Sequence, residues 1–273
     1  MSGSKALLDE LRVAPGSAPH LDRRDPGARL GADGKEAGAA RLTVLVERLG
    51  VLHNRLFAEA QRSVLLVLQG MDTSGKDGTV RRVLTGVNPQ GCRVVSFREP
   101  SPAELAHDYL WRVHAACPAR GELAIFNRSH YEDVVAARVR DLVAPKVWRR
   151  RYGHIRAFEQ LLTDEGTTVV KVFLHLSPEE QRTRLQERLD NPEKRWKFRV
   201  GDLADRRLWP DFAAAYEEAI RETSTEAAPW YVVPADHNWA RNLAVAEILV
   251  DAFERIDPQL PEPDPELEGI EID

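Results

Sequence analysis

The sequence has little cysteine and no long apolar run, and each shortage excludes a class of protein. Two cysteines among 273 residues cannot build a disulfide framework, and no Cys/His spacing predicts a zinc site. No apolar run is longer than the five residues from Val64 to Leu68, which is far short of a membrane span. The first residues lack the apolar core of a signal peptide. We therefore expect a cytoplasmic protein that does not enter a membrane.

The net charge of −5 hides an asymmetry along the chain. Residues 257–273 hold seven acids, four prolines and no base, which predicts a solvated tail. The rest of the chain is mildly basic, which is compatible with a polyanionic substrate. We expect an irregular N-terminal arm over residues 1–35, one domain over 36–256 and the acidic tail over 257–273.

Apolar residues at helical spacing predict an amphipathic helix from Glu36 to Arg62. Short apolar runs follow, each with a polar turn and a helix-like stretch behind it, as expected of buried strands. Strands that alternate with helices indicate an α/β fold with a parallel, doubly wound sheet. The predicted strands are Ser63–Leu68, Arg93–Phe97, Glu122–Phe126, Thr168–Leu176 and Trp230–Val233.

A phosphate-binding loop is predicted directly after the first of these strands. The segment GMDTSGKDG fits the first part of the P-loop pattern, in which glycines turn backbone N–H groups toward phosphate oxygens. Lys76 would add a mobile cation for the transferring phosphate. The ordinary alternative is a strand-to-helix turn with a solvated lysine. Besides Lys76, the residues expected to bind phosphate or nucleotide here are Gly70, Met71, Thr73, Ser74, Gly75, Asp77 and Gly78.

Two acids depart from the usual loop. Asp77 replaces the Ser or Thr that ligates Mg²⁺, and Asp72 lies inside the loop. A carboxylate there repels a nucleotide triphosphate unless a metal or an acceptor occupies it. Asp72 is therefore either a magnesium anchor or a group that orients the attacking phosphate, with a helix cap as the structural alternative.

The third predicted strand ends in a second polar motif, Asn127-Arg128-Ser129-His130-Tyr131-Glu132-Asp133. Strand carboxyl ends are where open α/β sheets bind ligands. Arg128 would neutralise phosphate charge, and Glu132 and Asp133 would serve a metal or act as a base. The alternative is that both acids favour the N-terminus of the next helix.

A basic segment from Arg182 to Arg207 holds nine bases and five acids, interrupted by proline and glycine. Flanked by helical patterns, it is typical of the lid of a phosphoryl-transfer enzyme. A solvated charged face is the competing interpretation. The aromatic residues Trp196 and Phe198 between the bases favour the lid.

With these motifs in place, the chain resembles the family-2 polyphosphate kinases, which are related in fold to thymidylate kinase. The resemblance rests on GMDTSGKDG, FNRSHYED, RLDNPEKRWKF and APWYVVPAD, in this order between residues 40 and 256. It implies a P-loop kinase fold, a parallel sheet with helices on both faces and a helical lid over about residues 184–207. It also implies Mg²⁺-dependent phosphoryl exchange between inorganic polyphosphate and a nucleotide, with Mn²⁺ as a substitute metal.

The resemblance also implies roles for single residues. Asp72 corresponds to the family's loop aspartate, which positions metal and the accepting phosphate, and Lys76 to its loop lysine. Arg128 and Arg188 resemble the catalytic arginines of the second motif and of the lid. From its place in the second motif, and not from the resemblance, Asp133 is expected to be catalytic and to hold metal together with Asp72. The remaining residues expected around nucleotide and phosphates are Asn127, Glu132, Lys194 and Lys197.

Many members carry Asp at the position of Asn127, whereas this chain has Asn followed by Glu132 and Asp133. This pattern resembles the branch that phosphorylates both mono- and diphosphates. We predict transfer from polyphosphate to AMP and ADP, with guanine nucleotides as a second class, in a homo-oligomer that binds no nucleic acid. The rival hypotheses are an ATP-dependent nucleoside monophosphate kinase and a non-catalytic polyanion-binding module.

Overall fold

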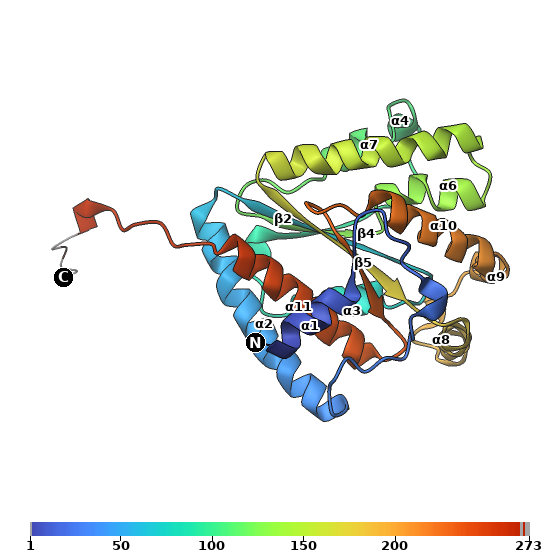
Figure 1. Ribbon diagram of the computed structural model, residues 1–273, viewed down its shortest axis with the longest axis horizontal. Helices are drawn as coiled ribbons and strands as arrows, with labels where there is room; N and C mark the ends of the chain where they lie inside the picture. Colours follow the sequence, from blue (N-terminus) through green and yellow to red (C-terminus); the bar gives the residue numbers. More distant parts are fainter. Residues whose placement is uncertain (1, 268–269, 271–273) are drawn as a thin grey trace.

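One six-stranded sheet forms the centre of the computed structural model, which describes residues 2–267 and residue 270. The strand order is β1-β6-β5-β2-β4-β3, and neighbours run parallel except β1, which pairs antiparallel with β6 (Figure 1). The strands are β1 (Arg12–Val13), β2 (Ser63–Gly70), β3 (Cys92–Ser96), β4 (Leu123–Asn127), β5 (Thr167–His175) and β6 (Trp230–Pro234). The predicted parallel sheet is confirmed, with its strands within a few residues of the expected bounds.

Helices join the strands, and short 3₁₀ turns (η) stand at several loops. The α-helices are α1 (Ser2–Leu11), α2 (Lys35–Glu59), α3 (Lys76–Val83), α4 (Pro102–Leu105), α5 (Trp111–His114), α6 (Ala136–Val139), α7 (Pro145–Asp164), α8 (Pro178–Asp190), α9 (Val200–Arg207), α10 (Trp209–Thr223) and α11 (Asn238–Ile256). The 3₁₀ turns are η1 (Leu21–Arg23), η2 (Pro89–Gly91), η3 (His130–Asp133), η4 (Arg195–Lys197) and η5 (Pro265–Leu267). Among the described residues, no helix has the length and apolar character needed to cross a membrane.

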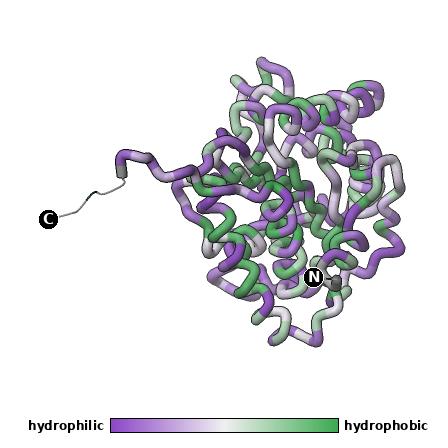
Figure 2. Tube along the Cα trace, turned by 60° about the vertical axis from the view of Figure 1, so that its left-hand side comes forward, coloured by the Kyte–Doolittle hydropathy of each residue, from purple (hydrophilic) through white to green (hydrophobic). Residues whose placement is uncertain are grey.

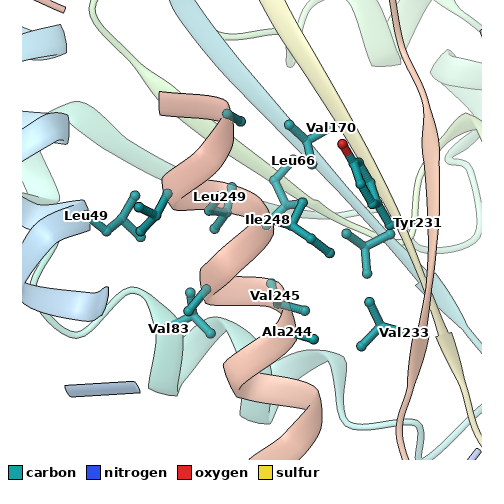
Figure 3. Close-up of a cluster of buried hydrophobic side chains, with 14 of the residues drawn as sticks. Leu49, Leu66, Val83, Val170, Tyr231, Val233, Ala244, Val245, Ile248 and Leu249 are labelled. Carbon is teal, nitrogen blue, oxygen red and sulfur yellow. The ribbon is translucent and has the colours of Figure 1, made fainter. Parts of the chain in front are cut away.

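Each face of the sheet is covered by its own apolar layer. Helices α2, α3 and α11 lie on one face, and α7 and α10 lie on the other (Figure 1). Figure 3 shows the first layer, where Leu66 of β2 faces α11 near Ile248 and Leu249, and Leu49 of α2 and Val83 of α3 lie on the other side of α11. The next residue of β2, Leu65, belongs to the opposite layer. This alternation buries β2 on both faces and makes it a rigid support for the loop that follows.

The first 35 residues are not irregular throughout, so that prediction is wrong for Ser2–Val13. This stretch forms α1 and β1, and Leu7, Leu8 and Leu11 pack into the core with at most 7% of their surface exposed. Val13 pairs with Trp230 at the edge of the sheet. The apolar residues of this short segment stand among Gly, Ser and Pro residues, so the sequence does not show the helix clearly. The segment is helical because its apolar side chains pack into the core.

The C-terminal segment leads away from the domain (Figures 1 and 2). Every residue from Gln259 to Glu266 is exposed. The acidic residues there contact solvent, as their charge favours. The limits of the domain at 36 and 256 and of the lid at 184 and 207 stay predictions.

Candidate active site

The candidate site lies where β2 and β4 end side by side at the carboxyl edge of the sheet. Leu68 of β2 stands opposite Asn127 of β4, and the backbone N–H of Arg128 donates to the carbonyl of Leu68 over 3.1 Å. This edge is where open α/β sheets bind their ligands. The structure therefore brings the loop of residues 70–78 and the motif of residues 127–133 together.

Lys76 is the first residue of α3, and its side chain folds back into the loop instead of reaching solvent. Its Nζ donates to the carbonyls of Gly70 at 2.7 Å and Met71 at 3.2 Å, and to the hydroxyl of Ser74 at 3.4 Å. Only 8% of the residue is exposed. Burial, helped by Arg128, lowers the pKa of Lys76 to about 8. The alternative of a merely solvated lysine is therefore wrong.

The loop backbone adopts left-handed conformations at three positions. Gly70 has φ 149° and Gly75 has φ 96°, values that glycine tolerates without strain. Thr73 has φ 65°, which is costly for a β-branched residue. Its buried hydroxyl has no hydrogen-bond partner within the part of the chain that is described. Strained residues with free donors are found at ligand-binding loops, so Thr73 fits the predicted phosphate-binding role.

Asp72 does not cap the following helix, so that alternative is wrong. The N-cap of α3 is Gly75, and no described side chain makes a capping hydrogen bond there. The Asp72 carboxylate instead accepts from Arg128 Nη2 at 2.8 Å. Burial raises the pKa of Asp72, but the nearby charges of Lys76 and Arg128 outweigh burial and leave this pKa below its usual value. The loop carboxylate is therefore held in its charged form.

Arg128 is the residue that links the two motifs. It has a left-handed backbone, with φ 64°, and its guanidinium lies between Asp72 at 2.8 Å and Glu132 at 3.5 Å. A second link joins Asn127, whose Nδ2 donates to Asp77 Oδ1 over 2.6 Å. Glu132 lies in η3 and pairs with Arg128, so it does not serve the N-terminus of α6.

Asp133 lies in η3 but faces a different partner from the other site residues. Arg151 of α7 donates to its backbone carbonyl at 2.8 Å and lies 3.7 Å from its carboxylate. Burial raises the pKa of Asp133. No contact between described residues joins Asp133 to Asp72, so the structure does not bring the two expected metal carboxylates together.

The basic segment meets the loop through α8 and α9, and not through the described residues between these helices. Arg188 Nη1 of α8 lies 3.9 Å from Asp202 of α9, and the Asp202 carboxyl contacts that of Asp72. Lys194 is exposed, and Lys197 lies 5.1 Å from the ring of Trp196. Among the described contacts, neither lysine touches the loop. Sequence reasoning missed Asp202, because an acid in a basic segment gives no signal of its own.

Three further side chains support the loop from outside; the sequence placed Arg184 in the lid and gave no role to Gln181 or Arg241. Gln181 Nε2 donates to the carbonyl of Asp72 at 3.2 Å. Arg184 Nη1 donates to the carbonyl of Thr73 at 2.9 Å. Arg241 Nη1 donates to the carbonyl of Ser74 at 3.2 Å. The loop thus has consecutive carbonyls bound by α8 and α11, which fixes the course of its backbone.

A buried polar network holds η3 from the opposite face of the sheet. Lys171 Nζ of β5 lies 2.6 Å from Glu159 Oε2 and donates to the hydroxyl of Tyr131 at 3.2 Å. Tyr131 in turn donates to Glu159 Oε1 at 2.8 Å. All three side chains are buried. The network fixes η3, which carries Glu132 and lies two residues after Arg128, so its effect on the site is one of position.

The residues of the site suit a divalent cation for which substrate phosphates supply the remaining ligands. Within the described chain, no group of three or more His, Cys, Asp or Glu could hold a metal by itself. Mg²⁺ is usually bound by one or two carboxylates together with substrate phosphates. The charged carboxylate of Asp72, beside the phosphate loop, suits that kind of site.

Comparison with known proteins gives one consistent family. The model of the family described as Polyphosphate kinase 2 matches residues 33–261. A protein of Meiothermus ruber named AMP/ADP-polyphosphate phosphotransferase is 57% identical over 267 residues, which is 97% of this chain and 100% of that protein. An ADP-polyphosphate phosphotransferase of Rhodopseudomonas palustris is 44% identical, over 96% of this chain and 94% of that protein.

A solved structure agrees with these relatives. The crystal structure of polyphosphate kinase 2 from Arthrobacter aurescens TC1 superposes with a TM-score of 0.91 and 42% identity, over 94% of this chain and 92% of that chain. The strand order and this likeness confirm the predicted P-loop kinase fold.

Proposed function

The chain belongs to the polyphosphate kinase 2 family, and we propose that it transfers a terminal phosphoryl group from inorganic polyphosphate to AMP and to ADP. The observation that supports this most strongly is the charged Asp72 carboxylate, held by Arg128 inside the phosphate loop. An acid at this place suits an enzyme that brings a metal and an accepting phosphate to the loop. The relatives named for AMP and ADP phosphotransfer support the choice of acceptor.

Catalysis would consist of positioning and charge neutralisation, because phosphoryl transfer needs little covalent help from the protein. The backbone N–H groups after Gly70 and the ammonium of Lys76 bind phosphate oxygens. Arg128 moves between its carboxylate partners and the moving phosphoryl group. Arg188 adds a second cation from α8. These three cations are worth most where negative charge develops in the transition state.

Mg²⁺ is the metal we propose, with Asp72 as the residue that holds it. When bound, the ion neutralises phosphate charge and orients the phosphates for in-line transfer. We keep Asp133 as a second candidate ligand, although Arg151 is its present partner. Asn127 and Glu132 lie beside Asp77 and Arg128 and are proposed to face the acceptor phosphates.

In this assignment residues 36–256 form the kinase domain, and the segment of residues 184–207 is its lid. Lys194 and Lys197 would reach the phosphates only after the lid moves, because they do not touch the loop in the described structure. The homo-oligomer and the cytoplasmic location stay predictions.

A donor and acceptor assay tests the proposal. The protein is supplied with AMP, ADP, GMP or GDP, long-chain polyphosphate and Mg²⁺ in the absence of ATP, and products are separated by ion-exchange chromatography. We expect ADP from AMP and ATP from ADP, and loss of both when EDTA is added. A requirement for ATP as donor would indicate the nucleoside monophosphate kinase instead, and binding without turnover would indicate the polyanion-binding module.

A further inference from the structure

Arg241 is a buried cation for which the described part of the chain offers no acidic partner. It lies in the first turn of α11, and 2% of its surface is exposed. Its guanidinium donates to Asn238 Oδ1 at 2.6 Å, Asn242 Oδ1 at 3.0 Å and the carbonyl of Ser74 at 3.2 Å. These acceptors are neutral, and no carboxylate of the described chain forms an ion pair with Arg241. A buried charge is usually paired, because leaving it unpaired is costly.

The guanidinium lies directly against the backbone of the phosphate loop. A Cβ atom placed on Gly75 would stand 1.9 Å from Arg241 Nη1, and one placed on Gly78 would stand 3.3 Å from Nη2. Gly75 is therefore required to be glycine for two reasons, its left-handed φ of 96° and the guanidinium packed over it. Arg241 is almost fully buried and packs against the loop backbone, so we expect any effect on substrate to pass through the loop.

The surroundings of Arg241 are already positive. Gly75 and Gly78 mark the N-terminal turn of α3, where the helix macrodipole presents positive potential. Arg184 of α8 is close enough to affect its ionisation, since burial together with the charge of Arg184 lowers the pKa of Arg241 to about 10. Arg184 has Glu180 as its own partner at 2.8 Å, whereas Arg241 has no acidic partner among the residues that the structure describes. Without ligand, the protein therefore carries a buried positive charge at Arg241 that no described carboxylate neutralises, in surroundings that are themselves positive.

We propose that Arg241 is a positioning residue that holds an unpaired positive charge behind the phosphate loop, and that the polyphosphate chain supplies the missing negative charge when it binds. The inference rests on the proposed function and goes beyond it, because it assigns a role to a buried residue that cannot touch substrate. It also explains why all of its hydrogen-bond acceptors are uncharged. A carboxylate in place of Asn238 or Asn242 would form an ion pair with Arg241. The charge of Arg241 would then be neutralised within the protein and would no longer attract phosphate.

The test separates charge from packing. Inorganic tripolyphosphate is titrated by calorimetry into the wild type, Arg241→Gln and Arg241→Lys, and each protein is also melted without ligand. We expect Arg241→Gln to bind tripolyphosphate at least about tenfold more weakly, a loss of about 1.4 kcal/mol, without a lower melting temperature. Arg241→Lys keeps the charge and should bind within about threefold of the wild type. The control is Arg255→Gln on the same helix, an exposed arginine paired with Asp251, which should change neither quantity.

A second variant keeps the test decisive if Arg241→Gln does not fold. Asn238→Asp places a carboxylate at the atom that lies 2.6 Å from the guanidinium. We expect it to raise the melting temperature without ligand and to weaken tripolyphosphate binding. Unchanged affinity in both Arg241→Gln and Asn238→Asp, or in the one of them that folds, would overturn the inference. Failure of the wild type itself to bind tripolyphosphate would instead overturn the proposed function.

Discussion

The guanidinium of Arg128 lies 2.8 Å from the carboxylate of Asp72, across 56 positions of sequence. The parallel pairing of β2 and β4 makes this contact, because it ends both strands at the same edge. Arg128 makes this contact from a left-handed backbone at φ 64°, a conformation that costs energy in a residue with a Cβ. The pair keeps the carboxylate charged and holds the arginine beside the loop before any substrate arrives.

Asp72→Asn separates the charge of this residue from its shape. Asparagine can still accept from Arg128, so the melting temperature should change little, since partly exposed ion pairs contribute about 0–1 kcal/mol. Turnover should fall by at least about a hundredfold, as expected when a group that stabilises transition-state charge is lost. Asp251→Asn, on the exposed face of α11, is the control and should retain full activity. Normal turnover of Asp72→Asn at ordinary Mg²⁺ would show that the catalytic assignment is wrong.

Lys76→Met tests the loop lysine with a side chain of similar length. The Nζ atom of Lys76 donates to the carbonyls of Gly70 and Met71 and so closes the loop. The positive charge of Lys76 would stabilise the transferring phosphate. We expect kcat to fall by more than about tenfold, which corresponds to about 1.4 kcal/mol of activation free energy. Lys146→Met, an exposed lysine of α7, is the matched control. Retention of more than about a tenth of the wild-type kcat would remove Lys76 from the mechanism.

The sequence predicts those parts of the molecule that local pattern determines. Apolar runs such as Val64–Leu68 report burial on both faces of a sheet, and the loop of Gly70 to Gly78 carries its backbone requirements in its own glycines. Their meeting with Arg128 follows from the pairing of β2 with β4, whereas the alternation of elements predicts only a parallel sheet and not the order of its strands.

The missed features depend on contacts between distant segments. Arg241 follows no motif, and only the packing of α11 against the loop reveals it. The burial of Lys76 also could not be predicted, because a loop lysine next to acids resembles a solvated one until the backbone carbonyls that it binds are placed. α1 was missed because a ten-residue helix is marginal by itself and forms against a core contributed by later residues.

Lys171→Met should destabilise the whole protein. Lys171 and Glu159 are buried partners at 2.6 Å, and removal of one leaves the other charge unpaired in the core. Such losses amount to about 3–5 kcal/mol. Urea unfolding measures the difference in free energy. The double variant Lys171→Met/Glu159→Gln should lose less than the sum of the single changes, because neither charge is then left alone. Additive losses would mean that the two residues act independently.

His53 should make stability fall in mild acid. The ring is fully buried in the layer between α2 and α11, its Nε2 lies 3.0 Å from the carbonyl of Gly91, and burial lowers its pKa. The unfolded chain therefore binds a proton more readily, so folding stability is complete above about pH 6.5 and is lost as the pH falls toward the folded pKa. His53→Gln can keep the bond to Gly91 without titrating. The unfolding free energy is compared at pH 7.5 and pH 5.5, both above about the pKa range of ordinary carboxylates. The loss between these two pH values should be smaller in this variant than in the wild type. Equal losses in the two proteins would exclude His53 as the source.

Arg188→Ala tests whether the basic segment closes over the phosphates. In the structure Arg188 is 3.9 Å from Asp202, whose carboxyl contacts Asp72, so this arginine already stands near the loop. Its loss should lower kcat more than it raises KM, as expected of an interaction that is strongest in the transition state. Lys194→Ala and Lys197→Ala should mainly raise KM for polyphosphate, and added salt should do the same, because it screens exposed charges over about 8 Å at physiological strength. Trypsin cleavage within residues 184–207 should slow when nucleotide, Mg²⁺ and polyphosphate are all present. Equal cleavage in both states, together with wild-type kinetics for Arg188→Ala, would mean that this segment is an ordinary charged surface.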